Sequence, residues 1–190
     1  MGKAFIVGIA GGSASGKSTL SNQLEKDLSG LNIQTIHMDF YFKLPEKRPY
    51  SEAPVTGITY MDDNHPMTMD LPKLADGLKE LAKTESCDVI IVEGLLTLWD
   101  KKIYSQLDLK LFVDCKPDER IVRRLRRNMQ NGLTFDEISS VYLDLVRYRH
   151  DEYVEPSKWQ ADFILNGSNP SEKAMCILTE YIKSKCRESD

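Results

Sequence analysis

Gly11-Gly12-Ser13-Ala14-Ser15-Gly16-Lys17-Ser18 is the stretch that decides the fold, because it matches the pattern G-x-x-x-x-G-K-[ST] of a phosphate-binding loop. It stands where such a loop is expected, directly after an apolar run at 4–9 and at the start of a helical pattern. Glycines let backbone amides approach phosphates closely, and the helix N-terminus adds partial positive charge. We therefore expect bound nucleotide phosphates, with Lys17 at the β- and γ-phosphates and the Ser18 hydroxyl on Mg²⁺.

Outside this loop, five short apolar runs bounded by turn residues predict buried strands. The runs lie at 4–9, 33–38, 88–92, 109–113 and 162–165. Helical spacing of apolar residues is found between them, at 18–28, 71–82, 118–129, 135–153 and 172–185. Strands that alternate with helices indicate an α/β fold of the P-loop NTPase type, with a five-stranded, mostly parallel sheet and helices on both faces. The length of 190 residues indicates one domain over 1–190.

Two segments interrupt this alternation. Residues 43–72 contain five of the eight prolines, which predicts a long irregular excursion over the surface, of a length that usually serves substrate binding. Residues 128–134 form a polar joint with a glycine between two predicted helices. This joint is either a hinge that closes a lid or merely a loop.

Composition excludes several classes of protein. Lys and Arg number 25 against 29 Asp and Glu, and the net charge is -4 with a pI near 5.5, so a dedicated nucleic-acid binder is disfavoured. No apolar run approaches the roughly 18 residues that a membrane span needs, and we expect a cytoplasmic chain with a small-molecule substrate. The four cysteines form no C-x-x-C pair, so neither a zinc site nor a disulfide framework is indicated.

Two predicted strands end in a carboxylate. Glu93 closes one apolar run, at the place where a P-loop protein holds Mg²⁺ or its water, although strands often end in an acid. Asp39 closes another and precedes Phe40, Tyr41 and Phe42. A carboxylate there can accept the proton of an acceptor hydroxyl, and aromatic side chains can wall a flat substrate. The alternative for this second group is a helix cap followed by core aromatics.

Five arginines fall within eight residues of one predicted helix, namely Arg120, Arg123, Arg124, Arg126 and Arg127. Helical spacing places all but Arg126 on one broad face, where they could clamp a transferring phosphoryl group; the alternative is a solvated charged face. The chain lacks the N-K-x-D guanine motif of a GTP switch. A small-molecule kinase is therefore the leading class.

Taken together, these residues resemble the uridine kinase and nicotinamide riboside kinase branch of the phosphoribulokinase-like P-loop kinases, over 8–165. The motifs that carry the resemblance are Gly11 to Thr19, Asp39-Phe40-Tyr41-Phe42, Asn64-His65-Pro66, Glu93-Gly94-Leu95-Leu96, Phe112-Val113-Asp114, Arg120 to Arg127 and Tyr153-Val154-Glu155-Pro156-Ser157-Lys158. The resemblance implies ATP and Mg²⁺ as cofactors and association into a homo-oligomer.

The resemblance also implies residue roles. Asp39 is the base on a 5′-hydroxyl, and Arg124 and Arg127 match the lid arginines, so the expected catalytic residues are these three and Lys17. Ser18 and Glu93 are the expected metal residues. The expected ATP-binding residues are Gly11, Gly12, Ser13, Ala14, Ser15, Gly16, Lys17, Ser18 and Thr19.

The departures from the family pattern concern the acceptor. Uridine kinases usually carry Asp-His-Pro where this chain has Asn64-His65-Pro66, so the carboxylate that binds the ribose is replaced, or is supplied by Asp63. Their pyrimidine-reading hairpin is missing, because the helical pattern at 71–82 runs almost directly into the next strand. Their Glu-Arg-Gly-Arg lid is Gln130-Asn131-Gly132-Leu133 here.

We nevertheless expect an ATP-dependent transfer to the 5′-hydroxyl of a nucleoside, with Tyr41, Asp63 or Tyr142 as candidate replacements for the missing reader. The expected substrate-binding residues are Asp39, Tyr41, Phe42, Asp63, Asn64, His65 and Tyr142. His65 is either such a contact or a turn residue before Pro66. The alternatives are a kinase for nicotinamide riboside or another small alcohol, and a non-catalytic nucleotide-binding regulator.

Overall fold

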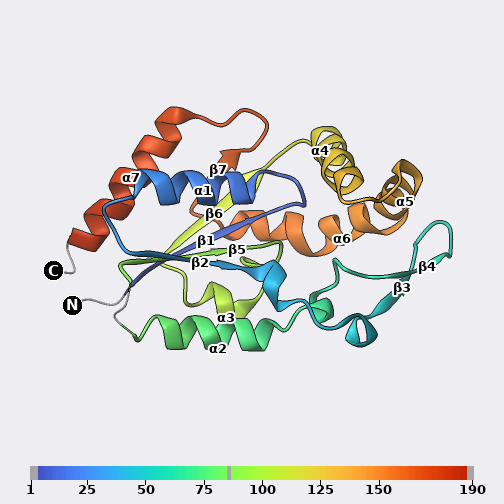
Figure 1. The fold of residues 1–190 in the computed structure, drawn as a ribbon, viewed down its shortest axis with the longest axis horizontal. Coiled ribbons are helices and arrows are strands. Elements are labelled where there is room, and N and C mark those ends of the chain that lie inside the picture. The colour runs from blue at the N-terminus through green and yellow to red at the C-terminus, as the bar shows by residue number, and fades with distance from the viewer. Residues whose placement is uncertain (1–3, 85–86, 188–190) are drawn as a thin grey trace.

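A five-stranded parallel sheet forms the centre of the computed structural model, which describes residues 4–84 and 87–187. The strands follow the order β2-β5-β1-β6-β7 (Figure 1). Their bounds are β1 Phe5–Gly11, β2 Ile33–His37, β5 Val89–Glu93, β6 Leu109–Asp114 and β7 Phe163–Asn166. All four neighbouring pairs are parallel, so the predicted sheet is confirmed and is parallel throughout.

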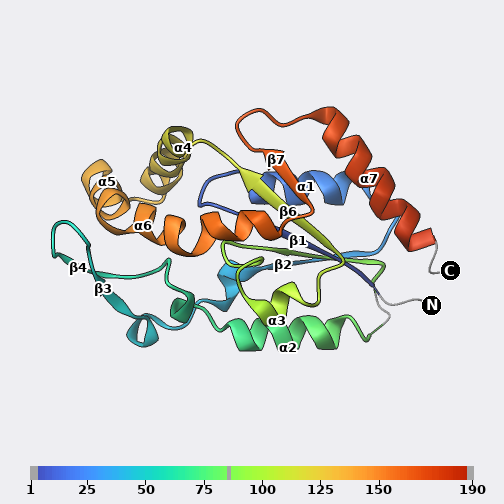
Figure 2. The same ribbon diagram turned by 180° about the vertical axis from the view of Figure 1, so that it is seen from behind.

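Helices cover both faces of this sheet, as expected. Their bounds are α1 Lys17–Asp27, α2 Leu71–Leu81, α3 Lys101–Tyr104, α4 Pro117–Gln130, α5 Phe135–Val141, α6 Arg147–Arg149 and α7 Glu172–Arg187. Figures 1 and 2 show α1 and α7 on one face and α2 and α3 on the other. Within the described chain, no helix is both long and apolar enough to span a membrane.

The central strand β1 contributes to a hydrophobic core on each face, because successive side chains of a strand point to opposite sides. Ile6 and Ala10 pack with residues of α2 and α3, whereas Val7 and Ile9 pack with residues of α1 and α7. A strand buried on both faces needs apolar residues at nearly every position. This explains why β1 is a continuous apolar run in the sequence.

The carboxyl ends of the strands meet at one edge of the sheet, where ligands bind in open α/β folds. The phosphate-binding loop follows β1 directly and leads into α1. In the register of β2 and β5, His37 lies beside Glu93. The topology therefore brings the loop, the end of β2 and the end of β5 to the same edge.

The excursion at 43–72 is more ordered than predicted. It contains an antiparallel hairpin of β3 (Tyr50–Glu52) and β4 (Thr59–Met61), together with two 3-10 turns. Gly57 has a φ of +71° in the hairpin loop, a conformation that glycine adopts without strain. Strands of three residues, none of them buried, carry too little apolar alternation to be recognised in the sequence. Figure 2 shows the hairpin beyond the end of the sheet, near α5.

The helical pattern at 135–153 is not one regular helix, which corrects a second expectation. Between α5 and α6 lies a π-helical segment, Tyr142–Val146, and after α6 lies another, His150–Val154. π-Helical turns are frequently found at functional sites, and apolar spacing does not reveal them. In the joint at 128–134, α4 ends at Gln130 and Thr134 caps α5 through a capping box with Glu137. Closure of this joint as a lid stays a prediction.

Candidate active site

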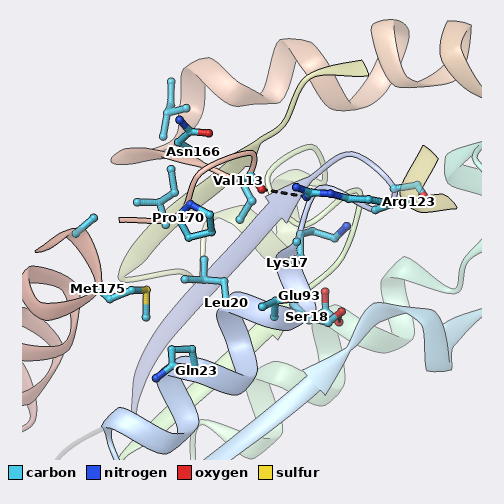
Figure 3. A pocket seen from close by; sticks show the side chains of 18 of the residues that line it. Lys17, Ser18, Leu20, Gln23, Glu93, Val113, Arg123, Asn166, Pro170 and Met175 are labelled. Carbon is cyan, nitrogen blue, oxygen red and sulfur yellow. Dashed lines mark hydrogen bonds between the residues drawn. The ribbon is translucent and has the colours of Figure 1, made fainter. Parts of the chain in front are cut away.

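A cavity of about 1650 Å³ opens at the carboxyl edge of the sheet (Figure 3). Its lining includes most of the side chains that the sequence predicts for the site. They are Ser13, Ala14, Gly16, Lys17, Ser18, Thr19, Asp39, Phe42, Asp63, Asn64, Glu93, Arg124 and Arg127. Gly11, Gly12 and Ser15 are buried in the loop behind this lining. Tyr41, His65 and Tyr142 do not line the cavity, although Tyr142 lies within electrostatic reach of Arg124.

The phosphate-binding loop has the backbone that its glycines predict. Gly16 has a φ of +109° and precedes the first turn of α1. A methyl group on Gly12 would lie 2.4 Å from Nη1 of Arg120, so a larger residue there would force the Arg120 side chain to shift. Lys17 Nζ donates a hydrogen bond of 3.1 Å to the carbonyl oxygen of Gly12. The loop is therefore held in a compact conformation by its own lysine.

Burial lowers the pKa of the Lys17 ammonium, and the positive charges of Arg127 and Arg120 lower it further. Glu93 and Asp39 act in the opposite direction, because their negative charges favour the ammonium form. Lys17 thus lies within electrostatic reach of both predicted carboxylates. A phosphate group at the loop would supply the negative charge that a buried ammonium lacks.

Glu93 at the end of β5 is a buried carboxylate with two partners on one oxygen. Ser18 Oγ donates to Oε1 over 3.0 Å, and His37 Nδ1 lies 2.8 Å from the same oxygen. Mg²⁺ in nucleotide sites takes one or two protein oxygens and completes its shell with phosphate and water. The hydroxyl and carboxylate oxygens of Ser18 and Glu93 fit this requirement. His37, which lies beside Glu93 in the sheet register, holds the carboxylate in place.

Asp39 lies on the 3-10 turn that follows β2, and the aromatic residues after it separate into three environments. Phe40 is 83% exposed and packs edge-on against the His37 ring. Tyr41 packs against the core that includes α2, and Phe42 lines the cavity. Each of the two interpretations of this segment therefore holds for part of it: Asp39 and Phe42 lie in the candidate site, whereas Tyr41 packs against the core.

The acceptor side of the cavity is formed by Phe42, Asp63 and Asn64. Arg48 supports two of these side chains from outside: its guanidinium carbon lies 4.7 Å from the Phe42 ring centre, and its Nη1 lies 3.1 Å from Asp63 Oδ1. His65 is a turn residue, since its Nδ1 accepts a hydrogen bond from the Met67 amide. Aromatic, carboxylate and amide groups together suit a hydroxylated substrate.

The arginine helix α4 does not use its arginines alike. Arg124 and Arg127 both donate to Ser13 Oγ, over 3.0 and 3.3 Å. Arg123 donates to the Gly167 carbonyl and pairs with Glu119, while Arg126 is exposed. These contacts place two arginines directly at the phosphate-binding loop.

Arg120 is 5% exposed and donates to the Cys115 carbonyl, so it lies behind the loop rather than in the clamp that its helical spacing predicts. Burial lowers the pKa of Arg124, as does the charge of Arg127, while Tyr142 and Asp63 raise it. Tyr142 thus lies close to the site although it does not line the cavity. An anion in the cavity would offset the charge that Arg124 and Arg127 concentrate there.

Sequence reasoning missed His37, Arg48 and the buried ion pair of Asp62 and Arg149, in which Oδ2 and Nε lie 2.6 Å apart. The position of His37 at the end of a predicted strand could have indicated its contact with Glu93, because neighbouring parallel strands that are in register end side by side. Arg48 and Arg149 carry no such signal, since their partners depend on how the excursion folds.

Comparisons with known proteins identify the family. A family model described as the phosphoribulokinase and uridine kinase family matches residues 59–172. A curated uridine kinase of Staphylococcus aureus (strain JH9) is 33% identical over 202 residues, which cover 94% of this chain and 95% of the relative.

Solved structures show the same fold. The phosphoribulokinase of Rhodobacter spheroides has a TM-score of 0.62 at 16% identity, covering 88% of this chain and 74% of that one. The structure of a possible uridine kinase from Bacillus stearothermophilus has a TM-score of 0.61 at 20% identity, covering 86% and 89%. With a family model that spans more than half of the chain and a relative at 33% identity, this P-loop kinase belongs to the phosphoribulokinase and uridine kinase family.

Proposed function

We propose that the chain transfers the γ-phosphoryl group of ATP to the 5′-hydroxyl of a nucleoside, with Mg²⁺ as cofactor. The observation that carries the proposal is that one cavity unites Lys17 and Ser18 with Asp39 and Arg124, from three separate segments of the chain. Phosphoryl transfer needs little covalent help from the protein and depends on positioning and charge neutralisation. The cavity supplies both.

Each residue has a defined task in this reaction. The loop amides and Lys17 hold the β- and γ-phosphates, while Arg124 and Arg127 neutralise the charge on the transferring group. Mg²⁺, held by Ser18 and Glu93, would supply further neutralisation of the phosphate oxygens. Asp39 accepts the proton of the acceptor hydroxyl. At the same time the hydroxyl oxygen of the acceptor bonds to the γ-phosphorus, and the bond between that phosphorus and the β-γ bridging oxygen breaks. The products are ADP and a phosphate monoester.

The proposed acceptor rests on Phe42, Asp63 and Asn64, which offer an aromatic wall and hydrogen-bond partners for ribose hydroxyls. The name of the Staphylococcus aureus relative supports a nucleoside. One observation favours a second candidate, a kinase for nicotinamide riboside or another small alcohol. Only seven residues separate the end of α2 at Leu81 from the start of β5 at Val89, too few for the pyrimidine-reading hairpin of uridine kinases.

The test is ADP release from ATP and Mg²⁺ with one acceptor at a time: uridine, cytidine, adenosine, nicotinamide riboside, pantothenate and simple sugars. Each reaction is checked for the phosphorylated product by mass spectrometry. We expect a nucleoside to stimulate ADP release most, and Asp39→Asn to lower kcat with that acceptor by about a hundredfold. Asp118→Asn, on the exposed first turn of α4, is the matched control and should keep the wild-type rate.

Three results would contradict the proposal. Stimulation by a sugar or pantothenate alone would move the chain to another acceptor class. Tight ATP binding without ADP release for any acceptor would favour a nucleotide-binding regulator. A wild-type rate in Asp39→Asn would remove this carboxylate from the role of base.

A further inference from the structure

The turn that presents Asp63 and Asn64 to the cavity is organised by the neighbouring Asp62, which has no exposed surface. Its carboxylate Oδ1 accepts a hydrogen bond of 3.2 Å from the Asn64 amide, and its carbonyl oxygen accepts one of 3.3 Å from the His65 amide. The Asp62 amide donates to the Pro49 carbonyl over 2.8 Å. A shift of Asp62 would therefore move both acceptor-side residues.

Arg149, the last residue of α6, binds the Asp62 carboxylate. Its Nε donates to Asp62 Oδ2 over 2.6 Å, and its Nη1 donates to Glu152. The guanidinium carbon also lies 5.9 Å from the centre of the Tyr153 ring, which itself packs edge-on against His65. Because the Arg149 side chain is only 19% exposed and has two carboxylate partners, its position is well defined.

The next residue, His150, reaches the phosphate-binding loop. A methyl group on Gly12 would lie 3.0 Å from Cε1 of the His150 ring, so the ring packs directly against the loop backbone. The ring Nε2 lies 3.3 Å from Glu155 Oε2. Two consecutive residues, at the junction of α6 and the second π-helical segment, thus contact the acceptor turn and the donor loop.

We propose that Arg149 and His150 form a positioning pair that sets the acceptor turn at the right distance from the phosphate-binding loop. Arg149 acts through Asp62 on Asp63 and Asn64, and His150 acts through Gly12 on the donor phosphates. Neither residue lines the cavity, so both would act through neighbouring residues. Such positioning is consequential because an error of about 1 Å between reacting groups costs about a hundredfold in rate.

This inference rests on the proposed function. Its test uses the whole chain with ATP, Mg²⁺ and the acceptor that stimulates ADP release most. Arg149→Met alone leaves a buried carboxylate without its cation and could unfold the chain. The main variant is therefore the double substitution Asp62→Asn with Arg149→Met. Arg147→Met is the matched control, because Arg147 is exposed on the same helix and contacts the neighbouring Tyr148 through its hydroxyl and ring.

We expect the double variant to raise the acceptor KM about tenfold while the KM for ATP stays within about twofold. ADP formed per molecule of phosphorylated acceptor should rise above the wild-type ratio, because a misplaced acceptor leaves the γ-phosphate open to water. Amide hydrogen exchange in the ligand-free chain should increase at Asn64 and His65, whose amides the turn protects. Arg147→Met should match the wild type in all of these.

His150→Gln tests the contact of the pair with the phosphate-binding loop. It should raise the ratio of ADP to phosphorylated acceptor without changing hydrogen exchange at Asn64 and His65. An unchanged ratio would remove His150 from the pair, and a folded double variant with wild-type acceptor KM and exchange would overturn the inference as a whole. If no acceptor is phosphorylated by the wild type, the proposed function fails and the inference fails with it. If the wild type phosphorylates an acceptor and the variants behave as the wild type does, only the inference is contradicted and the proposed function stands.

Discussion

The donor and acceptor sides of the cavity are built in different ways. The centre of the donor side is one continuous segment, Gly11 to Thr19, whose backbone forms the loop and whose lysine bonds to that loop, with Glu93, Arg124 and Arg127 added around it. The acceptor side is assembled by side-chain contacts between segments far apart, such as Asp62 with Arg149 and Tyr60 with Asp144, whose hydroxyl and carboxylate oxygens lie 2.8 Å apart. A site made of backbone is set by local sequence, whereas a site made of distant pairs is set by the fold.

This difference has a consequence for specificity. A substitution in the phosphate-binding loop alters the groups that hold the phosphates, so it affects every acceptor alike. A substitution in the excursion changes Asp63, Asn64 or their supports and leaves the loop as it is. Acceptor choice can therefore diverge between relatives while the donor chemistry stays the same.

The largest expected effect tests the donor side. Lys17→Met removes the ammonium that we propose to hold the β- and γ-phosphates, and we expect kcat to fall about a thousandfold with every acceptor that the wild type uses. Thermal unfolding should show a chain that remains folded, because the side chain makes one hydrogen bond to its own loop. The measurement is single-turnover transfer at saturating ATP.

Lys26→Met is the control for this substitution, since Lys26 is exposed in the last turn of the same helix. An acceptor-dependent loss in Lys17→Met, large for one acceptor and small for another, would contradict the separation of donor and acceptor sides. It would show that the lysine also sets acceptor position.

A smaller effect is expected where the two sides meet. Arg124→Met removes a guanidinium that donates to Ser13 and lies in the electrostatic field of Asp63, so it should affect both transfer and acceptor binding. We expect kcat to fall about a hundredfold and the acceptor KM to rise, with a smaller change in the KM for ATP. Arg126→Met, at an exposed position on the same helix, should leave all three constants unchanged. Equal effects of the two substitutions would mean that the helix contributes only general positive charge.

The same contrast explains what the sequence reveals. The phosphate-binding loop, Glu93 and Asp39 are recognisable because each follows an apolar strand, and parallel strands bring their carboxyl ends together. The hairpin β3–β4 is not recognisable, since its strands have three residues each and are largely exposed. The ion pair of Asp62 and Arg149 joins residues 87 positions apart, and no local spacing predicts such a partner. Helical periodicity identified the segment at 135–153 but not its π-helical turns, which alter the face that each side chain occupies.

The smallest expected effect is on the pH dependence of the free energy of unfolding, and it concerns His150, the residue that follows α6. Burial lowers the pKa of the His150 imidazole, and the nearby charge of Arg120 lowers it further, although Glu155 and Asp151 partly oppose this. The unfolded chain therefore binds a proton at a higher pH than the folded chain does. The stability contribution is complete above a pH of about 6.5, the ordinary value for histidine, and is lost as the pH falls through it toward the lowered pKa.

The free energy of unfolding of the wild type should fall between about pH 7.5 and 5.5, and we expect it to fall less steeply in His150→Gln. The two slopes should differ by at most about 1.4 kcal/mol per pH unit, the limit for a single proton. Urea unfolding at several pH values measures this. The difference between the variant and the wild type removes the contributions of all groups that both proteins share. Glu152 and Glu155 have pKa values below their ordinary 4.5, so their loss of pairing begins below this window. Parallel stability curves for the two proteins would show that the His150 ring is not held neutral against the loop, and the packing of its ring on Gly12 would then need another explanation.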